Sequence, residues 1–141
     1  MELPWETSST SPPKKKKLRE SQLWKNFKKA VATHKPAWKL TRIETWAMPG
    51  IPDVLICDEE GNLLLVELKV ASAFSVNLSP HQISFLTSHS KAPVWLLVGR
   101  DEELFLYRGS AAVEVGVKGL KVKPYCQSRT WEKVLPLLSA H

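Results

Sequence analysis

The alternation of apolar and polar residues predicts an ordered series of helices and strands. In chain order, the pattern predicts a helix at 18–33, strands at 38–47, 53–57 and 63–70, a helix at 79–89, and strands at 93–98 and 104–107. A closing helix at 129–139 fits the apolar spacing, although Pro136 is expected to break or kink it. The expected order is therefore helix, three strands, helix, two strands and a C-terminal helix.

The first predicted helix carries an acid on its apolar side. Leu23, Trp24 and Phe27 mark that side, and Glu20 precedes them by three, four and seven residues. Those intervals place Glu20 on the same stripe. An acid directed at a core needs a partner or a metal. In the first turn, however, the helix dipole favours an acid and water is near, so both explanations stay open.

A tight turn joins the second and third predicted strands. Glu59–Gly61 suits a three-residue hairpin loop, because the glycine stands where a type I turn followed by a bulge needs a left-handed residue. If Asp58 pairs with Asn62, Asp53 lies directly opposite Glu67, with Cβ atoms roughly 5 Å apart. Facing like charges destabilise a strand pair unless a divalent cation such as Mg²⁺ lies between them. A change of register by one residue would separate the acids, so this prediction depends on the turn.

The third predicted strand adds a lysine to the two acids. Side chains alternate along a strand, so every second residue from Leu64 to Val70 forms an apolar face, and Glu67 and Lys69 share the other face. A lysine there can orient or deprotonate an attacking water, or stabilise charge on a phosphate. A solvent-exposed strand face is the ordinary explanation for a Glu and a Lys at this spacing. The facing Asp53 is what favours a site.

Positive charge is concentrated at the start of the chain. Residues 1–42 hold eleven Lys and Arg against three Glu, whereas the remainder holds nine basic residues against eleven acidic ones. Residues 1–17 are expected to form a disordered basic arm ahead of a single domain at 18–141. Such an arm suggests nucleic acid as the partner, although a solvated tail explains the charge too, and Trp5 and Trp38 could be free to contact DNA. The cations expected to bind DNA are Lys14, Lys15, Lys16, Lys17, Arg19, Lys25, Lys28 and Lys29.

Several classes of protein fit the sequence poorly. No stretch approaches the ~18 apolar residues that a membrane span needs, and the first residues lack the apolar core of a secretory signal. Cys57 and Cys126 have no partner spacing and are expected to be reduced thiols of an intracellular protein. In a eukaryote, the lysines at 14–17 would resemble a nuclear import signal. A phage-encoded protein would instead act in the cytoplasm of the host.

The order of these residues resembles the signature of the PD-(D/E)XK nuclease superfamily. The resemblance rests on Gly50-Ile51-Pro52-Asp53, then thirteen residues, then Glu67-Leu68-Lys69. A fuller series is similar to small phage-type and VRR-NUC-like nucleases. It adds Glu20 with Leu23-Trp24, Arg42-Ile43-Glu44, and Leu78-Ser79 with Gln82, and it covers residues 19–107.

The resemblance implies a fold and a chemistry. The fold is an α/β restriction-endonuclease-like core, in which a mixed sheet is flanked by helices. The chemistry is hydrolysis of a DNA phosphodiester with Mg²⁺ or Mn²⁺. Asp53, Glu67 and the main-chain carbonyl of Leu68 would bind the metal. Lys69 would be the catalytic lysine, and Glu20 the first-helix acid that many members direct at the metal.

Two further positions allow alternative explanations. In related nucleases a glutamine on the second helix approaches the active site, and Gln82 matches it. Ser79 and Gln82 would also form a capping box at the start of that helix. Arg42 and Glu44 share a strand face and are expected to form an ion pair. Glu44 is the alternative acid if Glu20 proves to be remote.

The sequence therefore predicts a metal-dependent DNA endonuclease. Related junction resolvases act as dimers on branched DNA, so the resemblance allows a homodimer that selects branches or Holliday junctions. No Ser or Cys has a base at a suitable spacing, which argues against a covalent intermediate. The alternatives are a catalytically silent DNA-binding or recombination-accessory protein on the same fold, and an interaction domain with a basic tail.

Overall fold

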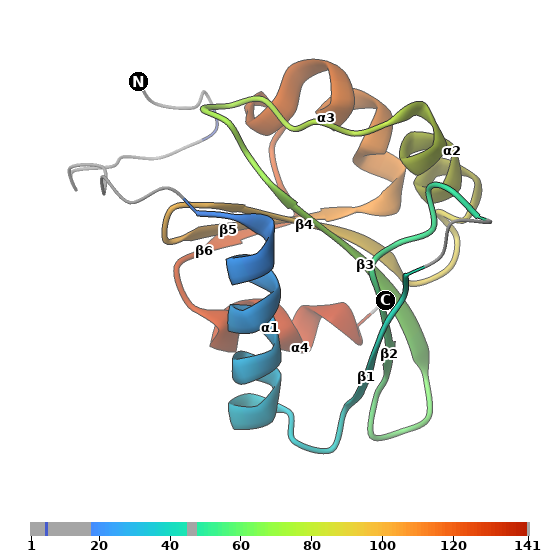
Figure 1. Ribbon diagram of the computed structural model, residues 1–141, viewed down its shortest axis with the longest axis vertical. Helices are drawn as coiled ribbons and strands as arrows, with labels where there is room; N and C mark the ends of the chain where they lie inside the picture. Colours follow the sequence, from blue (N-terminus) through green and yellow to red (C-terminus); the bar gives the residue numbers. More distant parts are fainter. Residues whose placement is uncertain (1–4, 6–17, 45–47, 141) are drawn as a thin grey trace.

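The computed structural model describes Trp5, residues 18–44 and residues 48–140 as an α/β fold with one mixed sheet (Figure 1). In these residues the helices are α1 (Glu20–His34), α2 (Pro80–Ser88), α3 (Ala112–Lys118) and α4 (Trp131–Leu138). The strands are β1 (Lys39–Arg42), β2 (Val54–Cys57), β3 (Leu63–Val70), β4 (Val94–Arg100), β5 (Glu103–Arg108) and β6 (Cys126–Ser128). Short 3₁₀ turns at Gly109–Ala111 and Gly119–Lys121 flank α3.

The six strands lie side by side in the order in which they occur along the chain. β3 and β4 are parallel, and every other neighbouring pair is antiparallel. Parallel neighbours need a crossover connection, which the segment containing α2 supplies. The carboxyl ends of the two central strands therefore meet at the same end of the sheet, beside the start of β2.

Helices cover both faces of the sheet and enclose two apolar cores. α1 and α4 pack on one face, where Phe27, Val66 and Leu135 are fully buried. α2 and α3 pack on the other face, around Leu86 and Leu96. The apolar stripe predicted for the first helix is confirmed, since its stripe residues pack into the first core. None of the helices in the described ranges is long and apolar enough to cross a membrane.

The predicted turn and register between β2 and β3 are confirmed. Val54 pairs with Val66, and the Asp58 N–H donates to the Asn62 carbonyl at 2.9 Å. Gly61 has a φ of +86°, the left-handed conformation that the bulge requires. The Asp58 carboxylate accepts from the main-chain N–H of Asn62 at 2.8 Å. Burial alone would raise the pKa of Asp58, but hydrogen bonds from Asn62 and the loop main chain outweigh it and lower that pKa.

Several predicted boundaries are wrong, and two elements were missed. β1 ends at Arg42 instead of continuing to residue 47, and residues 45–47 lie outside the described residues. Pro136 lies inside α4 and does not end it. The missed elements are α3 and β6, which no pattern in the sequence predicted.

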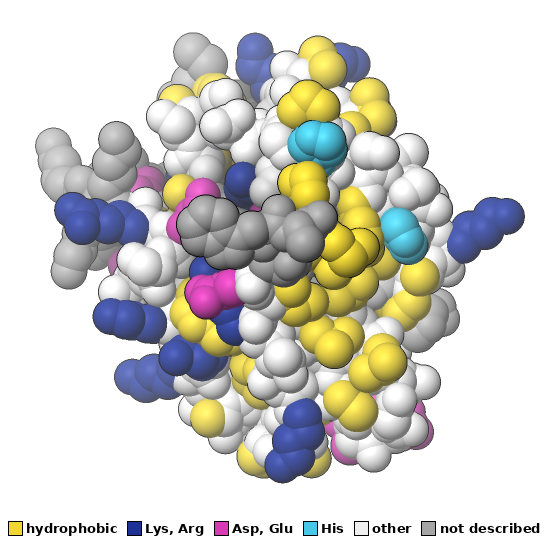
Figure 2. Space-filling model, turned by 45° about the vertical axis from the view of Figure 1, so that its right-hand side comes forward, with side chains coloured by type: hydrophobic (Ala, Val, Ile, Leu, Met, Phe, Trp, Pro, Cys, Tyr) yellow, Lys and Arg dark blue, Asp and Glu magenta, His cyan; other side chains and the backbone are white. Residues whose placement is uncertain are grey.

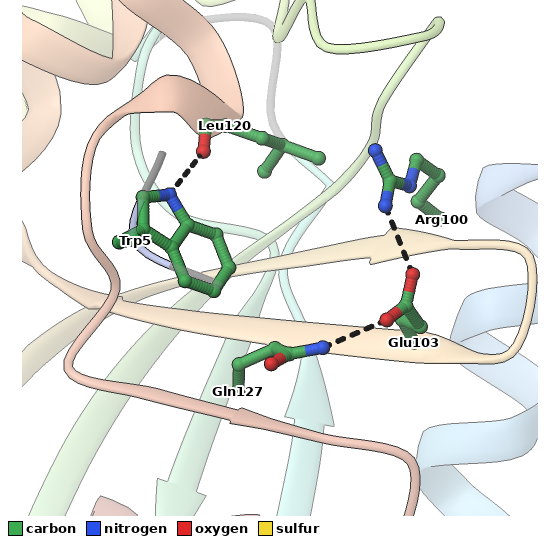
Figure 3. Close-up of polar contacts among 5 residues, drawn as sticks. All are labelled: Trp5, Arg100, Glu103, Leu120 and Gln127. Carbon is green, nitrogen blue, oxygen red and sulfur yellow. Dashed lines mark hydrogen bonds and ion pairs between the residues drawn. The ribbon is translucent and has the colours of Figure 1, made fainter. Parts of the chain in front are cut away.

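The tryptophans predicted to be free for DNA are both packed. The indole N–H of Trp5 donates to the Leu120 carbonyl at 2.7 Å (Figure 3). The Trp5 ring also meets Phe105 edge-on, with ring centroids 5.8 Å apart. Trp38 is buried and donates to a Glu59 carboxylate oxygen at 2.6 Å. The rest of the predicted basic arm lies outside the described residues.

Candidate active site

Asp53, Glu67 and Lys69 meet where β3 approaches its end. The pairing of Val54 with Val66, extended by one residue, puts Asp53 across from Glu67. The apolar residues of β3 alternate between the two cores, so Glu67 and Lys69 lie on the face covered by α2. One Asp53 oxygen accepts from the main-chain N–H of Leu68 at 3.0 Å, which ties the acid to β3.

Glu67 is a buried acid with an incomplete set of partners. It is only 2% exposed. Burial, followed by repulsion from the Asp53 carboxylate, raises its pKa from 4.5 to about 9, against the opposing charge of Lys69. Its Oε2 accepts from the Gln82 amide at 3.1 Å, whereas its buried Oε1 has no hydrogen-bond partner. A buried carboxylate oxygen without a donor is costly, so this position favours a proton or a cation.

Gln82 caps α2 and also contacts Glu67. The side-chain oxygen of Gln82 accepts from the main-chain N–H of Ser79 at 2.9 Å. The main-chain N–H of Gln82 donates to the Ser79 hydroxyl at 3.1 Å. These two bonds form the predicted capping box at the start of α2. The other end of the same amide donates to Glu67. The cap therefore fixes the donor that orients the buried acid.

The loop before Asp53 passes directly against α2. Gly50 has a φ of +91°, and a Cβ atom at this position would overlap the main-chain carbonyl of His81. Glycine is therefore required both by the conformation and by the close approach. This contact positions Asp53 relative to the first turn of α2, which carries Gln82.

The main chain of Leu68 adds an oxygen on the same side. The regular pairing of β2 with β3 reaches Val54 and Val66. Two residues further along β3, the main-chain N–H of Leu68 donates to the Asp53 carboxylate. In a strand, the N–H and C=O of one residue project in the same direction. The Leu68 carbonyl therefore faces the Asp53 side as well. Two carboxylates and one carbonyl are oxygen ligands of the kind that Mg²⁺ and Mn²⁺ favour.

Glu20 lies near this group but is not part of it. It is the first residue of α1 and is exposed, as expected for an acid at the dipole of a first turn. Its charge nevertheless contributes to the raised pKa of Glu67. Within the described ranges, no three His, Cys, Asp or Glu side chains lie close enough to hold a metal together. Glu44 is not among the charges that perturb Glu67.

The predicted ion pair between Arg42 and Glu44 is wrong. The Arg42 guanidinium instead lies over the Trp24 ring, with its carbon 5.0 Å from the ring centroid. Among the residues that the structure describes, the side-chain ion pair within 4.0 Å is Arg100 with Glu103. Neither the stacking of Arg42 nor the close approach of Gly50 was predicted, although the unusual Gly-x-Pro-Asp turn was a usable signal for the second.

The basic residues predicted to bind DNA form part of the exposed surface. Arg19, Lys25, Lys28 and Lys29 are all exposed on or next to α1. Figure 2 shows Lys and Arg side chains gathered toward the left of that view, with a few acids among them. The lysines at 14–17 lie outside the described residues.

Comparisons of this chain with protein-family models, curated proteins and solved structures gave no match.

Proposed function

We propose that this chain is a metal-dependent DNA endonuclease built on a restriction-endonuclease-like core of the PD-(D/E)XK type. The observation that carries the proposal is the buried Glu67 beside Asp53, with one carboxylate oxygen that has no hydrogen-bond partner. A buried acid beside a second, half-buried acid destabilises a fold unless something neutralises them. Lys69 on the same strand face supplies one positive charge.

The donor set fits a hard divalent cation. Asp53, Oε1 of Glu67 and the carbonyl of Leu68 would hold Mg²⁺ or Mn²⁺, with waters in the remaining positions, because such ions keep part of their hydration. When bound, the ion would supply Lewis-acid chemistry, polarising the phosphate and easing the loss of a proton from water. Gln82 keeps Glu67 oriented by holding its other oxygen at 3.1 Å. Glu20 acts from a distance, through its negative charge.

Lys69 has the role closest to the reacting atoms. It shares a strand face with Glu67, one side-chain step along β3. The neutral amine of a lysine there would take up the proton of the attacking water, whereas the ammonium would orient that water and stabilise the charge that develops on the phosphate. The absence of any suitable base beside a Ser or Cys in the sequence fits direct attack by water.

DNA is the substrate that the surface charge favours. The exposed lysines of α1 offer sequence-independent contacts to phosphates, so binding should weaken steeply with salt. Cutting both strands of a branch would need two such sites, and a homodimer would supply them. Branched DNA is therefore the first substrate to test.

A cleavage assay tests the proposal directly. Full-length protein is incubated with branched, nicked and linear DNA, with and without Mg²⁺, beside Asp53→Ala, Lys69→Ala and the control Glu103→Ala. Mg²⁺-dependent cutting by the wild type and the control, but not by the two site variants, is the expected result. Cutting that both site variants retain would remove the proposed site. Binding without cutting by any form would favour the catalytically silent DNA-binding protein.

Metal binding can be tested without DNA. Mn²⁺ is expected to stabilise the folded protein against unfolding by about 3 kcal/mol when present at a hundredfold excess over its Kd. Asp53→Ala should lose this stabilisation, and Glu103→Ala should keep it. A crystal soaked in Mn²⁺ should hold the ion between Asp53 and Glu67. An ion at another position would contradict the assigned ligands.

A further inference from the structure

Trp24, on α1, has two cations against its ring, one from α1 and one from the edge strand β1. The Arg42 guanidinium carbon is 5.0 Å from the ring centroid, and Nζ of Lys28 is 5.2 Å from it. The ring is half-buried and stacked on Phe27, with centroids 6.3 Å apart and planes 25° from parallel. Because the core fixes the indole, the indole in turn limits the motion of two long side chains that belong to different elements.

Neither cation is held by an acid. Both Arg42 and Lys28 are exposed, and in the described part of the chain the one side-chain ion pair joins Arg100 and Glu103. The stacking leaves the N–H donors at the edge of the guanidinium, and the ammonium of Lys28, open to an anion. Arginine with a neighbouring lysine is a suitable donor set for a phosphate, since the guanidinium binds two of its oxygens at once.

Arg42 lies close along the sheet to Asp53. Arg42 pairs with Val54, and the main-chain N–H of Ile43 donates to the Asp53 carbonyl at 2.7 Å. Neighbouring strands are about 4.8 Å apart, so Arg42 and Asp53 belong to the same end of the sheet. The Trp24 stack is on the α1 face, however, whereas Glu67 and its partners are on the α2 face.

We propose that Lys28 and Arg42, ordered by Trp24, form a clamp for a backbone phosphate of the DNA strand that enters the active site. This inference rests on the proposed nuclease function and names the surface that presents the strand to it. A strand that touches both the clamp and Asp53 must pass over the shared end of β1 and β2. Among the described residues, no aromatic ring lies against the Lys25 or Lys29 ammonium, so these two lysines would add only diffuse attraction.

The test is DNA affinity in full-length protein that cannot cut. Asp53→Ala serves as the background, with Mg²⁺ present and a short fluorescein-labelled branched duplex, and anisotropy is followed from about 50 to 200 mM salt. In that background, Arg42→Gln and Lys28→Gln are each expected to raise Kd about five- to tenfold and to lower the salt slope by about 1. Lys91→Gln, on the exposed turn before β4, removes the same charge elsewhere and should change Kd less than about twofold.

Trp24→Leu tests whether the Trp24 ring orders Lys28 and Arg42, because it removes the ring and leaves both charges in place. It keeps an apolar side chain and both cations, so Kd should rise about two- to threefold while the salt slope stays the same. Thermal melting shows whether the variant is folded, and Trp24→Met, which also lacks the ring, replaces it if it is not. Unchanged affinity in whichever of these two variants is folded would overturn the ordering role of Trp24.

The proposed phosphate clamp and the proposed nuclease activity can be contradicted independently. If Arg42→Gln and Lys28→Gln bind like Lys91→Gln, the clamp is wrong, even if the protein with Asp53 intact cuts DNA. If both variants lose affinity but the protein with Asp53 intact never cuts, the clamp stands and hydrolysis is wrong. Absence of DNA binding by every form overturns both proposals.

Discussion

Two β-hairpins of this sheet place charged side chains opposite each other, and the two pairs differ in almost every respect. In the β4–β5 hairpin, Arg100 and Glu103 have opposite charges, meet at 2.9 Å and are 19% and 15% exposed. Gln127 donates to the second oxygen of Glu103 at 2.7 Å (Figure 3). In the β2–β3 hairpin, two acids face each other and Glu67 is almost fully buried.

The difference indicates which of the two pairs stabilises the fold. A partly exposed pair of opposite charges adds little free energy but leaves no group without a partner. A buried acid beside a half-buried one lowers stability, and nothing in the hairpin itself requires it. The second pair therefore supports the proposed binding of a cation. Changes at the acid pair and its neighbours can therefore be compared with changes at the satisfied pair and its turn.

The largest difference is expected in catalysis. Lys69→Met keeps the length of the side chain and removes its charge, so the rate of DNA cleavage at saturating DNA should fall about 10²- to 10³-fold. Glu103→Gln, in the other hairpin, should change that rate less than about threefold. Single-turnover assays of the two variants measure the contrast. Equal rates would show that the charges at the β3 end have no special part in the reaction.

The next difference is expected in how the free energy of unfolding of the metal-free protein depends on pH. The pKa of Glu67 is raised from 4.5 to about 9 in the folded protein, so folding favours its protonated form. Its favourable contribution is complete below pH 4.5 and is lost as the pH rises toward 9. Glu67→Gln imitates the protonated form, and at pH 8 it should raise the free energy of unfolding by about 3 kcal/mol, with little change at pH 5.

Urea unfolding in EDTA at pH 5, 6.5 and 8 measures this trend. Glu103→Gln should shift the free energy of unfolding by at most about 1 kcal/mol, with no gain at high pH. A Glu67→Gln protein that is less stable than the wild type at pH 8 would mean that the buried carboxylate is satisfied after all.

Local chemistry explains why so much of the acid pair could be predicted. The register depends on the turn, and Asp58, Gly61 and Asn62 specify that turn within a few residues of sequence. Once the turn is fixed, the positions of Asp53 and Glu67 follow from the period of a strand. The capping box of α2 was readable for the same reason.

Other parts depend on contacts that no local pattern records. α3 is short and contains Val113, Val115 and Val117, which disfavour an isolated helix. It is held by packing against α2 and the second core. β6 has three residues and exists because β5 offers it an edge. Spacing placed Glu20 on the stripe of α1, and its exposure agrees with the alternative that the sequence left open, an acid in a first turn near water.

A smaller effect separates the two tasks of Gln82. Gln82→Ala removes both the cap oxygen and the donor to Glu67, and it should lower stability by about 1 to 2 kcal/mol at any pH. Gln82→Glu keeps the cap oxygen but loses the donor. At pH 5 the protonated Glu67 can donate to the new carboxylate, so metal-free stability should match the wild type. At pH 8 the added acid should make it less stable than the wild type, and equal stability at both pH values would mean that Gln82 acts only as a cap.

The smallest effects should come from substitutions in the two turns. Gly61 has a φ of +86° and open space around it, so Gly61→Ala adds strain without a clash and should lower the free energy of unfolding by about 1 kcal/mol. Asp101 in the β4–β5 turn has a φ of +55°, and Asp101→Gly relieves strain but frees the unfolded chain. Its net effect should lie within about 0.5 kcal/mol of zero. The strand register, and not the loop residue itself, places Asp53 opposite Glu67. Gly61→Ala protein that has folded should therefore keep its metal-dependent cleavage. A loss of cleavage without a loss of stability would mean that the turn does more than set the register.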